Sequence, residues 1–326
     1  MSKTQKRKSV SYAKYGYLFS LPFVLAYLIF YLYPTVYTAI IGFTDLKGVA
    51  TNAWHFLDEP FKNFTKILTN KTFIGSVKTT FTIWIINFIP QMSLALLLTA
   101  WFTQRKVNIK GQGAFKVMFY MPNIITAATV AILFATFFGY PVGPVNSLLK
   151  MLGVPEPIFF VNDAWTSRLI VAFIQFWQWY GYTAIVLISG VLGINPTLFE
   201  SAEIDGATPA QIFFKVTLPC MRTILIYTLI TSLIGGLNMF DIPKLFNNGM
   251  PANATLTASV FIYNQAFSGT YMYNRAAAAS MIMFAIIAVL SVGVFYLMRD
   301  RYDEKEKRLT RKMERDARKA KGGKLV

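Results

Sequence analysis

Cysteine and histidine are nearly missing from this sequence, which contains one residue of each, Cys220 and His55. A lone cysteine cannot support a disulfide framework, and one histidine with one cysteine supplies too few ligands for a zinc site. A glycine-rich loop ending in Gly-Lys-Ser or Gly-Lys-Thr, which would cradle nucleotide phosphates, is also missing. The sequence therefore excludes disulfide and zinc chemistry and predicts no ATPase activity in this chain.

Charge is scarce as well, because 14% of the 326 residues are Asp, Glu, Lys or Arg, whereas 55% are hydrophobic. A soluble domain of this size needs more polar surface, so the composition indicates a protein that lies in a lipid bilayer. The net charge of +17 comes from basic residues at the chain ends and in short loops. That pattern is typical of membrane orientation. We expect membrane lipid, and no nucleic acid, among the partners.

Six uncharged runs are long enough to cross the hydrocarbon core, which takes about 20 apolar residues in a helix. They lie within residues 14–45, 78–105, 116–150, 168–200, 222–241 and 275–299. A seventh uncharged run, 245–274, is rich in Asn, Gly, Pro and Thr, and we expect an outer loop with partial helix there. The sequence thus predicts an all-α integral membrane protein with six transmembrane helices.

Positive charge predicts which side of the membrane each end faces. Four segments hold 23 of the 32 Lys and Arg residues, and the positive-inside rule places such segments in the cytoplasm. These segments are 1–16, 104–116, 194–222 and 299–326. Both termini are therefore expected to be cytoplasmic. The predicted organisation has three parts: a basic N-terminus at 1–16, a six-helix transmembrane domain at 17–298 with a cytoplasmic loop at 194–219, and a basic C-terminal tail at 299–326.

The interiors of the six runs contain no Asp, Glu, Lys or His, apart from Lys78, whose side chain is expected to snorkel at the outer end of the second span. Carriers coupled to protons or sodium usually keep such groups at membrane depth, because these groups carry the coupling charge. An intramembrane enzyme would need a general acid, a base or a metal ligand there. We therefore predict that the chain is not an enzyme and that a partner outside the bilayer supplies the energy.

The cytoplasmic loop between the fourth and fifth spans has the local signals of two short helices joined by a bend. The Asn-Pro pair at 195–196 is a cap and first residue for a helix that ends near Ile204. Gly206 is suited to the left-handed conformation that ends such a helix. The Thr-Pro pair at 208–209 repeats the start for a second helix, and Pro219 is expected to open the fifth span.

This loop resembles a sequence shared by the permeases of ABC importers: Glu-Ala-Ala, three residues, Gly, nine residues, Ile, any residue, Leu-Pro. The matching positions are Glu200, Ser201, Ala202, Gly206, Val216, Leu218 and Pro219. Ser201 and Val216 are conservative departures from this pattern. The string EIDGA at 203–207 is similar to the carbohydrate branch, and so is the opening LFSLPFVLAYLIFYLYPTVYTAIIGFTD. The chain is identified as a member of the maltose-type, binding-protein-dependent permease family.

The resemblance implies a type I ABC importer permease fold that works by alternating access in a bacterial cell membrane. Two ATP-binding-cassette ATPase subunits would bind ATP and Mg, while this chain would bind no cofactor or metal. The other implied partners are a second permease subunit and an extracellular solute-binding protein. The contact that couples this chain to the ATPase would comprise Glu200, Ser201, Ala202, Glu203, Asp205, Gly206 and Pro219.

A solute path is predicted from polar and aromatic residues in the third, fourth and fifth spans. Sugar hydroxyls need hydrogen-bonding groups, and the CH faces of a sugar ring pack on aromatic rings. The residues are Asn123, Gln178, Tyr180, Gly181, Tyr182, Ser232, Gly236 and Asn238. Positions matching Asn123, Tyr180, Gly181, Ser232 and Gly236 line the path in sugar permeases. Some maltose-type members carry asparagine at Gly236, so the resemblance does not extend to the identity of the sugar.

Other interpretations stay open. Interfacial aromatic belts and close helix packing also explain Trp, Tyr and small residues in membrane helices. An ABC permease for glycerol phosphate or a polyamine would share the loop, although an anionic solute favours a basic residue inside the pore and the six runs show none. A secondary carrier is the alternative of a different class, and the uncharged interiors weigh against it.

Overall fold

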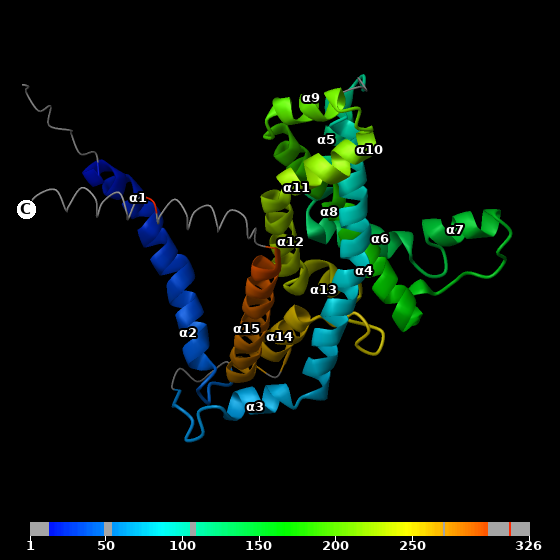
Figure 1. Ribbon diagram of the computed structural model, residues 1–326. Helices are drawn as coiled ribbons and strands as arrows, with labels where there is room; N and C mark the ends of the chain where they lie inside the picture. Colours follow the sequence, from blue (N-terminus) through cyan, green and yellow to red (C-terminus); the bar gives the residue numbers. More distant parts are fainter. Residues whose placement is uncertain (1–12, 49–53, 105–108, 270, 299–312, 314–326) are drawn as a thin grey trace, which may run out of the picture. The chain divides into compact units, whose positions relative to one another are not determined.

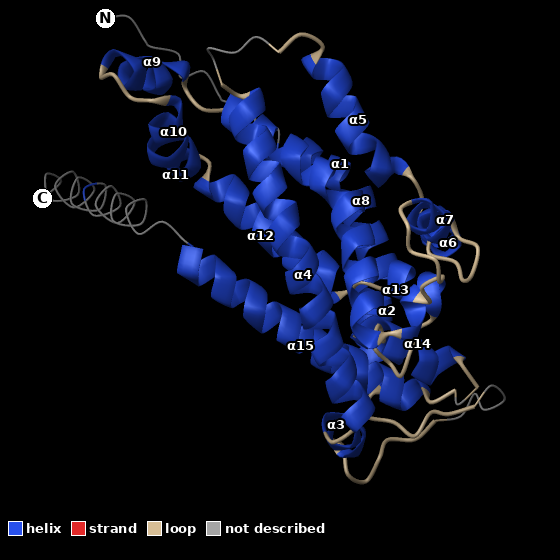
Figure 2. Cartoon of the chain, turned by 90° about the vertical axis from the view of Figure 1, so that its right-hand side faces the viewer, coloured by secondary structure: helices blue, strands red, loops and turns tan. Residues whose placement is uncertain are grey.

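The computed structural model describes residues 13–48, 54–104, 109–269, 271–298 and 313. Figure 1 shows helices along the described chain, and Figure 2 shows loops between them. Apart from an isolated antiparallel bridge between Thr44 and Phe56, the described residues form no β structure. The predicted all-α fold is confirmed for this part of the chain. The predicted N-terminus at 1–16 lies largely, and the tail at 299–326 almost entirely, outside the described residues.

Among the described residues, five helices are long and apolar enough to cross a membrane. The first consists of α1 (Ala13–Tyr27), a π-helical turn (Leu28–Leu32) and α2 (Tyr33–Ile41); the others are α4 (Lys71–Phe102), α8 (Ala164–Leu192), α12 (Arg222–Leu237) with α13 (Asp241–Asn247), and α15 (Tyr273–Met298). A helix satisfies its own backbone hydrogen bonds, which is why uncharged runs of this length fold as helices in lipid.

The third predicted run, 116–150, does not form a straight span. It contains α5 (Gln112–Ile124), α6 (Ala127–Phe137) and α7 (Pro144–Met151). The axes of α5 and α6 differ by 89°, because Ile125 and Thr126 are extended and the Thr126 hydroxyl caps α6 by accepting the N–H of Thr129 at 3.3 Å. The described residues contain six candidate spans only when this bent pair counts as one.

The fifth predicted span also departs from a single helix. Asn238 is the residue that ends α12. Its backbone N–H and its side-chain amide both donate to the Ile234 carbonyl, at 3.1 and 2.9 Å. Phe240 is non-helical, with φ −129°, and the chain then forms α13. Asp241, which the sequence suggested as the outer boundary, therefore lies within the candidate span Arg222–Asn247.

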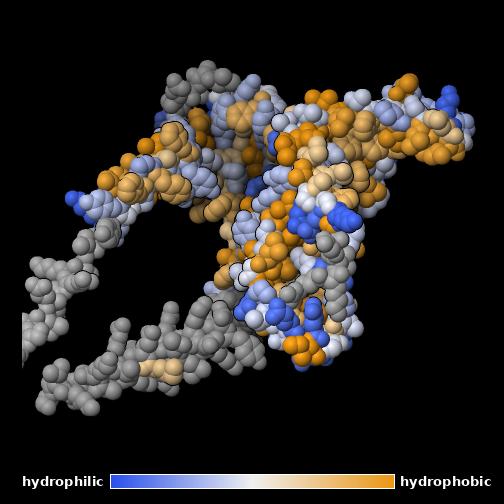
Figure 3. Space-filling model, turned by 90° about the horizontal axis from the view of Figure 1, so that it is seen from above, coloured by the Kyte–Doolittle hydropathy of each residue, from blue (hydrophilic) through white to orange (hydrophobic). Residues whose placement is uncertain are grey.

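The chain divides into two compact units, residues 1–74 with 261–284 and residues 75–260 with 285–326. In the first unit, α1, the π-helical turn and α2 present an apolar surface, with Phe19 of α1 and Phe30 of the turn about four-fifths exposed. Figure 3 shows apolar side chains, in orange, over much of the visible face. Exposed apolar side chains of this kind suit a helix that faces lipid or another transmembrane helix.

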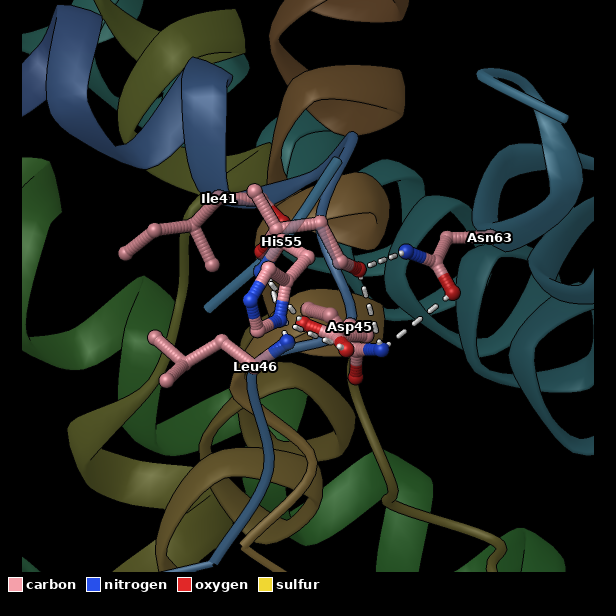
Figure 4. Close-up of polar contacts among 7 residues, drawn as sticks. Ile41, Asp45, Leu46, His55 and Asn63 are labelled. Atoms are coloured by element: carbon pink, nitrogen blue, oxygen red, sulfur yellow. Dashed lines mark hydrogen bonds and ion pairs between the residues drawn. The ribbon is translucent and has the colours of Figure 1, made fainter. Parts of the chain in front are cut away.

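The loop after α2 is held by buried amides within the first unit (Figure 4). Asn63, on α3 (Lys62–Leu68), donates to the Thr44 carbonyl at 2.9 Å, and Asn274 donates to the same oxygen at 3.3 Å. The backbone N–H of His55 donates to Asp45 Oδ1 at 2.8 Å. These bonds hold the segment after α2 in place against α3 and the start of α15.

In the second unit, α8 packs against α5, α12 and α13, and α13 packs against α6. One buried core includes Ile83, Val171 and Ile242, and a second includes Leu98 and Leu187. At one end of these helices lie α9 (Pro196–Ile204), α10 (Pro209–Ile212) and α11 (Leu218–Cys220), as Figures 1 and 2 show. The remaining described helix, α14, spans Ala258–Phe267.

Candidate functional site

A cavity of about 390 Å³ lies among α4, α8, α12 and α13. Amide, hydroxyl and aromatic side chains from helices far apart in the sequence face it together. The polar ones include Asn87, Gln91, Gln178, Tyr182, Ser232 and Asn238. This mixture suits a solute with many hydroxyls and flat CH faces, because each hydroxyl needs a partner after it leaves water.

Five of the eight predicted path residues line this central cavity, and three do not. Those on the cavity are Gln178, Tyr182, Ser232, Gly236 and Asn238. Asn123 instead donates to the Gln178 backbone carbonyl at 3.3 Å, and the ring of Tyr180 stacks on Phe176 with centroids 5.6 Å apart. Gly181 lies against α5, where a Cβ would stand 1.8 Å from the Phe119 carbonyl oxygen. The part that these eight residues play in transport stays a prediction.

The prediction missed the contribution of α4 to the cavity. Trp84, Asn87 and Gln91 line it at helical spacing, and both amide residues are buried. The amide of Gln91 donates to Thr183 Oγ1 on α8 at 2.8 Å. A buried amide is costly without a partner. Two amides four residues apart in IWIINFIPQMS were therefore the sequence signal for an inward-facing polar stripe.

Gly236 leaves room for a tryptophan ring on the cavity wall. A Cβ at this position would stand 2.0 Å from Trp84 Cδ1, whereas a Cβ at the neighbouring Gly235 would meet nothing within 4 Å. The indole Nε1 of Trp84 also lies 3.5 Å from Ser232 Oγ, to which it donates. The space beside Gly236 is thus occupied by the aromatic ring of Trp84.

The loop between α8 and α12 has the local structure that its sequence predicts. Asn195 caps α9 by accepting the N–H of Thr197 at 3.1 Å. Gly206 is left-handed, with φ +75°, and two bonds close the end of α9: the Gly206 N–H donates to the Glu203 carbonyl and the Ala207 N–H to the Ala202 carbonyl. These predictions about helix ends are confirmed.

The second helix of the loop begins as predicted but continues differently. Thr208 and Gln211 exchange hydrogen bonds between side chain and backbone in both directions, which is a capping box. The chain then runs through a π-helical turn, Phe213–Thr217, into α11. Pro219 therefore lies within α11 and does not open the fifth span, which begins at Arg222.

A second cavity, of about 600 Å³, separates this loop from the C-terminal half of α4. Its walls are largely apolar and include Leu97, Trp101, Phe199, Phe213 and Leu218. Phe199 and Leu218 also pack against the buried core around Leu187 of α8. The loop is thus joined to the spans through apolar packing, and we call this second cavity the loop groove.

The loop residues predicted to contact the ATPase differ in exposure. Glu200, Ser201, Asp205 and Gly206 are exposed, whereas Ala202 and Glu203 are partly buried. Ile204, at the end of α9, exposes 85% of its surface. An apolar side chain that protrudes among polar neighbours is available to a partner protein. Among the described residues, no group of three His, Cys, Asp or Glu lies close enough to hold a metal ion.

Comparison with known proteins identifies the family. Residues 72–308 match the family described as "Binding-protein-dependent transport system inner membrane component", which is more than half of the chain. The chain belongs to this family. It is 30% identical to the arabinooligosaccharides transport system permease protein of Bacillus subtilis (strain 168), over 85% of this chain and 86% of the relative.

Two further relatives agree with this family. The lactose transport system permease protein of Rhizobium radiobacter is 28% identical over 88% of this chain and 94% of its own. A chain of the bacterial alginate ABC transporter, crystallised with an alginate pentasaccharide-bound periplasmic protein, matches with a TM-score of 0.74 and 26% identity over 88% and 94% of the two chains. The predicted type I ABC importer permease fold is confirmed, and the protein is a multi-pass membrane component of an ABC transporter.

Proposed function

We propose that this permease forms half of the pore of an ATP-driven importer for a sugar or oligosaccharide in a bacterial cell membrane. The central cavity carries the proposal, because amides, hydroxyls and aromatic rings line it together within a bundle of candidate spans. The relatives named for lactose, arabinooligosaccharides and alginate support the sugar class.

The energy comes from partners. Two ATP-binding-cassette subunits hold ATP and Mg, a second permease completes the pore, and a solute-binding protein delivers the sugar outside. Both termini lie in the cytoplasm, on the side of the ATPases. The family description, which names binding-protein-dependent transport, supports this assembly.

The loop with α9 and α10 passes ATPase motion to the spans. Residues 200–206 form the docking end, at which Ile204 protrudes into a groove of the ATPase. Motion of α9 then reaches α8 through Phe199, which packs on the core around Leu187. Closure of the ATPases opens the pore outward, and hydrolysis returns it inward; this is alternating access.

Uptake by the reconstituted four-subunit transporter tests the function. We expect ATP-dependent accumulation of radiolabelled lactose or arabinooligosaccharides with the cognate binding protein, and none of glycerol 3-phosphate or spermidine. Ser232→Ala, on the cavity, should lower uptake, because it removes a hydroxyl from the lining. Ser189→Ala is the matched control on the exposed face of α8, where the hydroxyl bonds only its own helix. Accumulation without nucleotide, or a preference for glycerol 3-phosphate, would refute the proposal.

A further inference from the structure

Asp241 is the one charged residue among the described residues that line the central cavity. It is exposed, and its carboxylate has no hydrogen-bond or ion-pair partner among the described residues. It also lies inside the candidate span Arg222–Asn247. Ionisable residues inside membrane spans are rare and usually functional, so the presence of Asp241 in this candidate span indicates a role beyond filling space.

We propose that Asp241 is a charge filter that selects neutral sugars over acidic ones; this rests on the proposed function of the cavity as a sugar site. A carboxylate accepts charge-assisted hydrogen bonds from sugar hydroxyls, and its two oxygens can serve two neighbouring hydroxyls at once. The same carboxylate repels a uronate or a phosphate, because like charges at one site repel each other. The lining includes no Lys, Arg or His from the described residues to offset it.

A purely structural role for Asp241 makes a different prediction. As the first residue of α13, it can stabilise the positive end of that short helix. Loss of such a role would weaken the binding of every solute to the same extent. A charge filter instead changes the ratio between the affinities for neutral and acidic solutes.

A matched pair of disaccharides measures this ratio. β-1,4-mannobiose and β-1,4-dimannuronate differ at C6, where hydroxymethyl groups are replaced by carboxylates. Binding to the full transporter in lipid nanodiscs, without binding protein, can be followed through the fluorescence of Trp84 and Trp179, which line the cavity. We expect the wild type to favour mannobiose by about tenfold or more, since like charges at one site are strongly disfavoured.

In Asp241→Asn the ratio of the affinities for mannobiose and dimannuronate should fall close to one, mainly because dimannuronate binds more tightly. Asp241→Glu keeps the charge and should keep the preference. Equal affinities in the wild type, or an unchanged ratio in Asp241→Asn, would overturn the filter.

Ionic quenchers test the filter without any sugar. Iodide and neutral acrylamide both quench tryptophan, and the component lost in Trp179→Phe reports the cavity. We expect Asp241→Asn to raise iodide quenching of this component and to leave acrylamide quenching unchanged. An equal response of both quenchers would contradict the filter. Failure of all sugars to bind would count against the proposed function, while the iodide result would still decide the role of Asp241.

Discussion

The central cavity and the loop groove differ in how they are built. Residues of the central cavity come from positions as far apart as Trp84 and Ile242, and polar groups face one another across it. The loop groove is lined largely by apolar side chains, from α4 and from one continuous loop segment. Polar groups in the first can bind and select a solute, whereas apolar packing in the second can transmit force. Binding and coupling should therefore be separable by mutation.

Gly206→Pro is expected to have the largest effect, a loss of coupling to the ATPase without a loss of solute binding. Proline cannot adopt the φ of +75° found there, and it removes the N–H that donates to Glu203. A proline at an incompatible position costs about 3 kcal/mol or more. Because about 1.4 kcal/mol corresponds to a factor of ten, we expect the rate of solute-stimulated ATP hydrolysis to fall by tenfold or more. Solute binding, measured by cavity tryptophan fluorescence, should stay at the wild-type level.

Gly153→Pro is the matched control for this prediction. Gly153 also has a positive φ, +94°, donates its N–H to a carbonyl three residues earlier, and has open space around it, but it lies in the link between α7 and α8. Its replacement should leave stimulated hydrolysis intact. Equal loss in both variants would mean that general unfolding, and not coupling, explains the effect.

Gly236→Ala is expected to have a smaller effect of the opposite kind, a change in solute binding without a loss of coupling. The added Cβ forces the Trp84 ring to move, at a cost of about 1–3 kcal/mol if the neighbours cannot adjust. Solute affinity should change, while the stimulation of hydrolysis by bound solute remains. Gly75→Ala adds the same methyl group to α4 at a position that does not line the cavity and where nothing lies within 4 Å, and it should leave solute affinity unchanged. Similar affinities in the two variants would show that the Trp84 contact does not shape the site.

The sequence could predict the ends of the loop helices but not which residues meet in the cavity. The loop is continuous, so the signals at Asn195, Gly206 and Thr208 act on their own neighbours and predicted its helix ends. The cavity depends on which faces of four helices meet. Gln178 and Tyr182 of one string point into it while Tyr180 packs elsewhere, a distinction that needs the neighbouring helices. The 89° bend at Thr126 was missed because run length records apolarity and not direction.

The smallest effect is expected at Asp163, which caps α8, the helix that lines the central cavity and packs against the loop. Its Oδ2 accepts the N–H of Thr166 at 2.7 Å at the start of α8, and this bond, with that to the Thr166 hydroxyl, lowers the pKa of the Asp163 carboxyl below its ordinary value of 3.8. Asp163→Ala should slightly lower the thermal unfolding midpoint of the detergent-solubilised transporter, because α8 loses its cap. Binding and coupling should weaken together, since α8 lines the central cavity and its core around Leu187 packs against Phe199 and Leu218 of the loop.

The pH dependence of that midpoint identifies the carboxylate as the cause. Because the folded-state pKa lies below 3.8, the contribution of Asp163 is complete well above pH 3.8 and is lost as the pH falls through the lower folded value. The gap between wild type and Asp163→Ala should thus be constant from pH 7 to pH 5 and close at lower pH. Asp163→Asn keeps an acceptor for the Thr166 N–H without a charge, so its midpoint should lie between the two at pH 7. A gap that persists after the carboxyl is protonated would show that side-chain packing, and not ionisation, holds the start of α8.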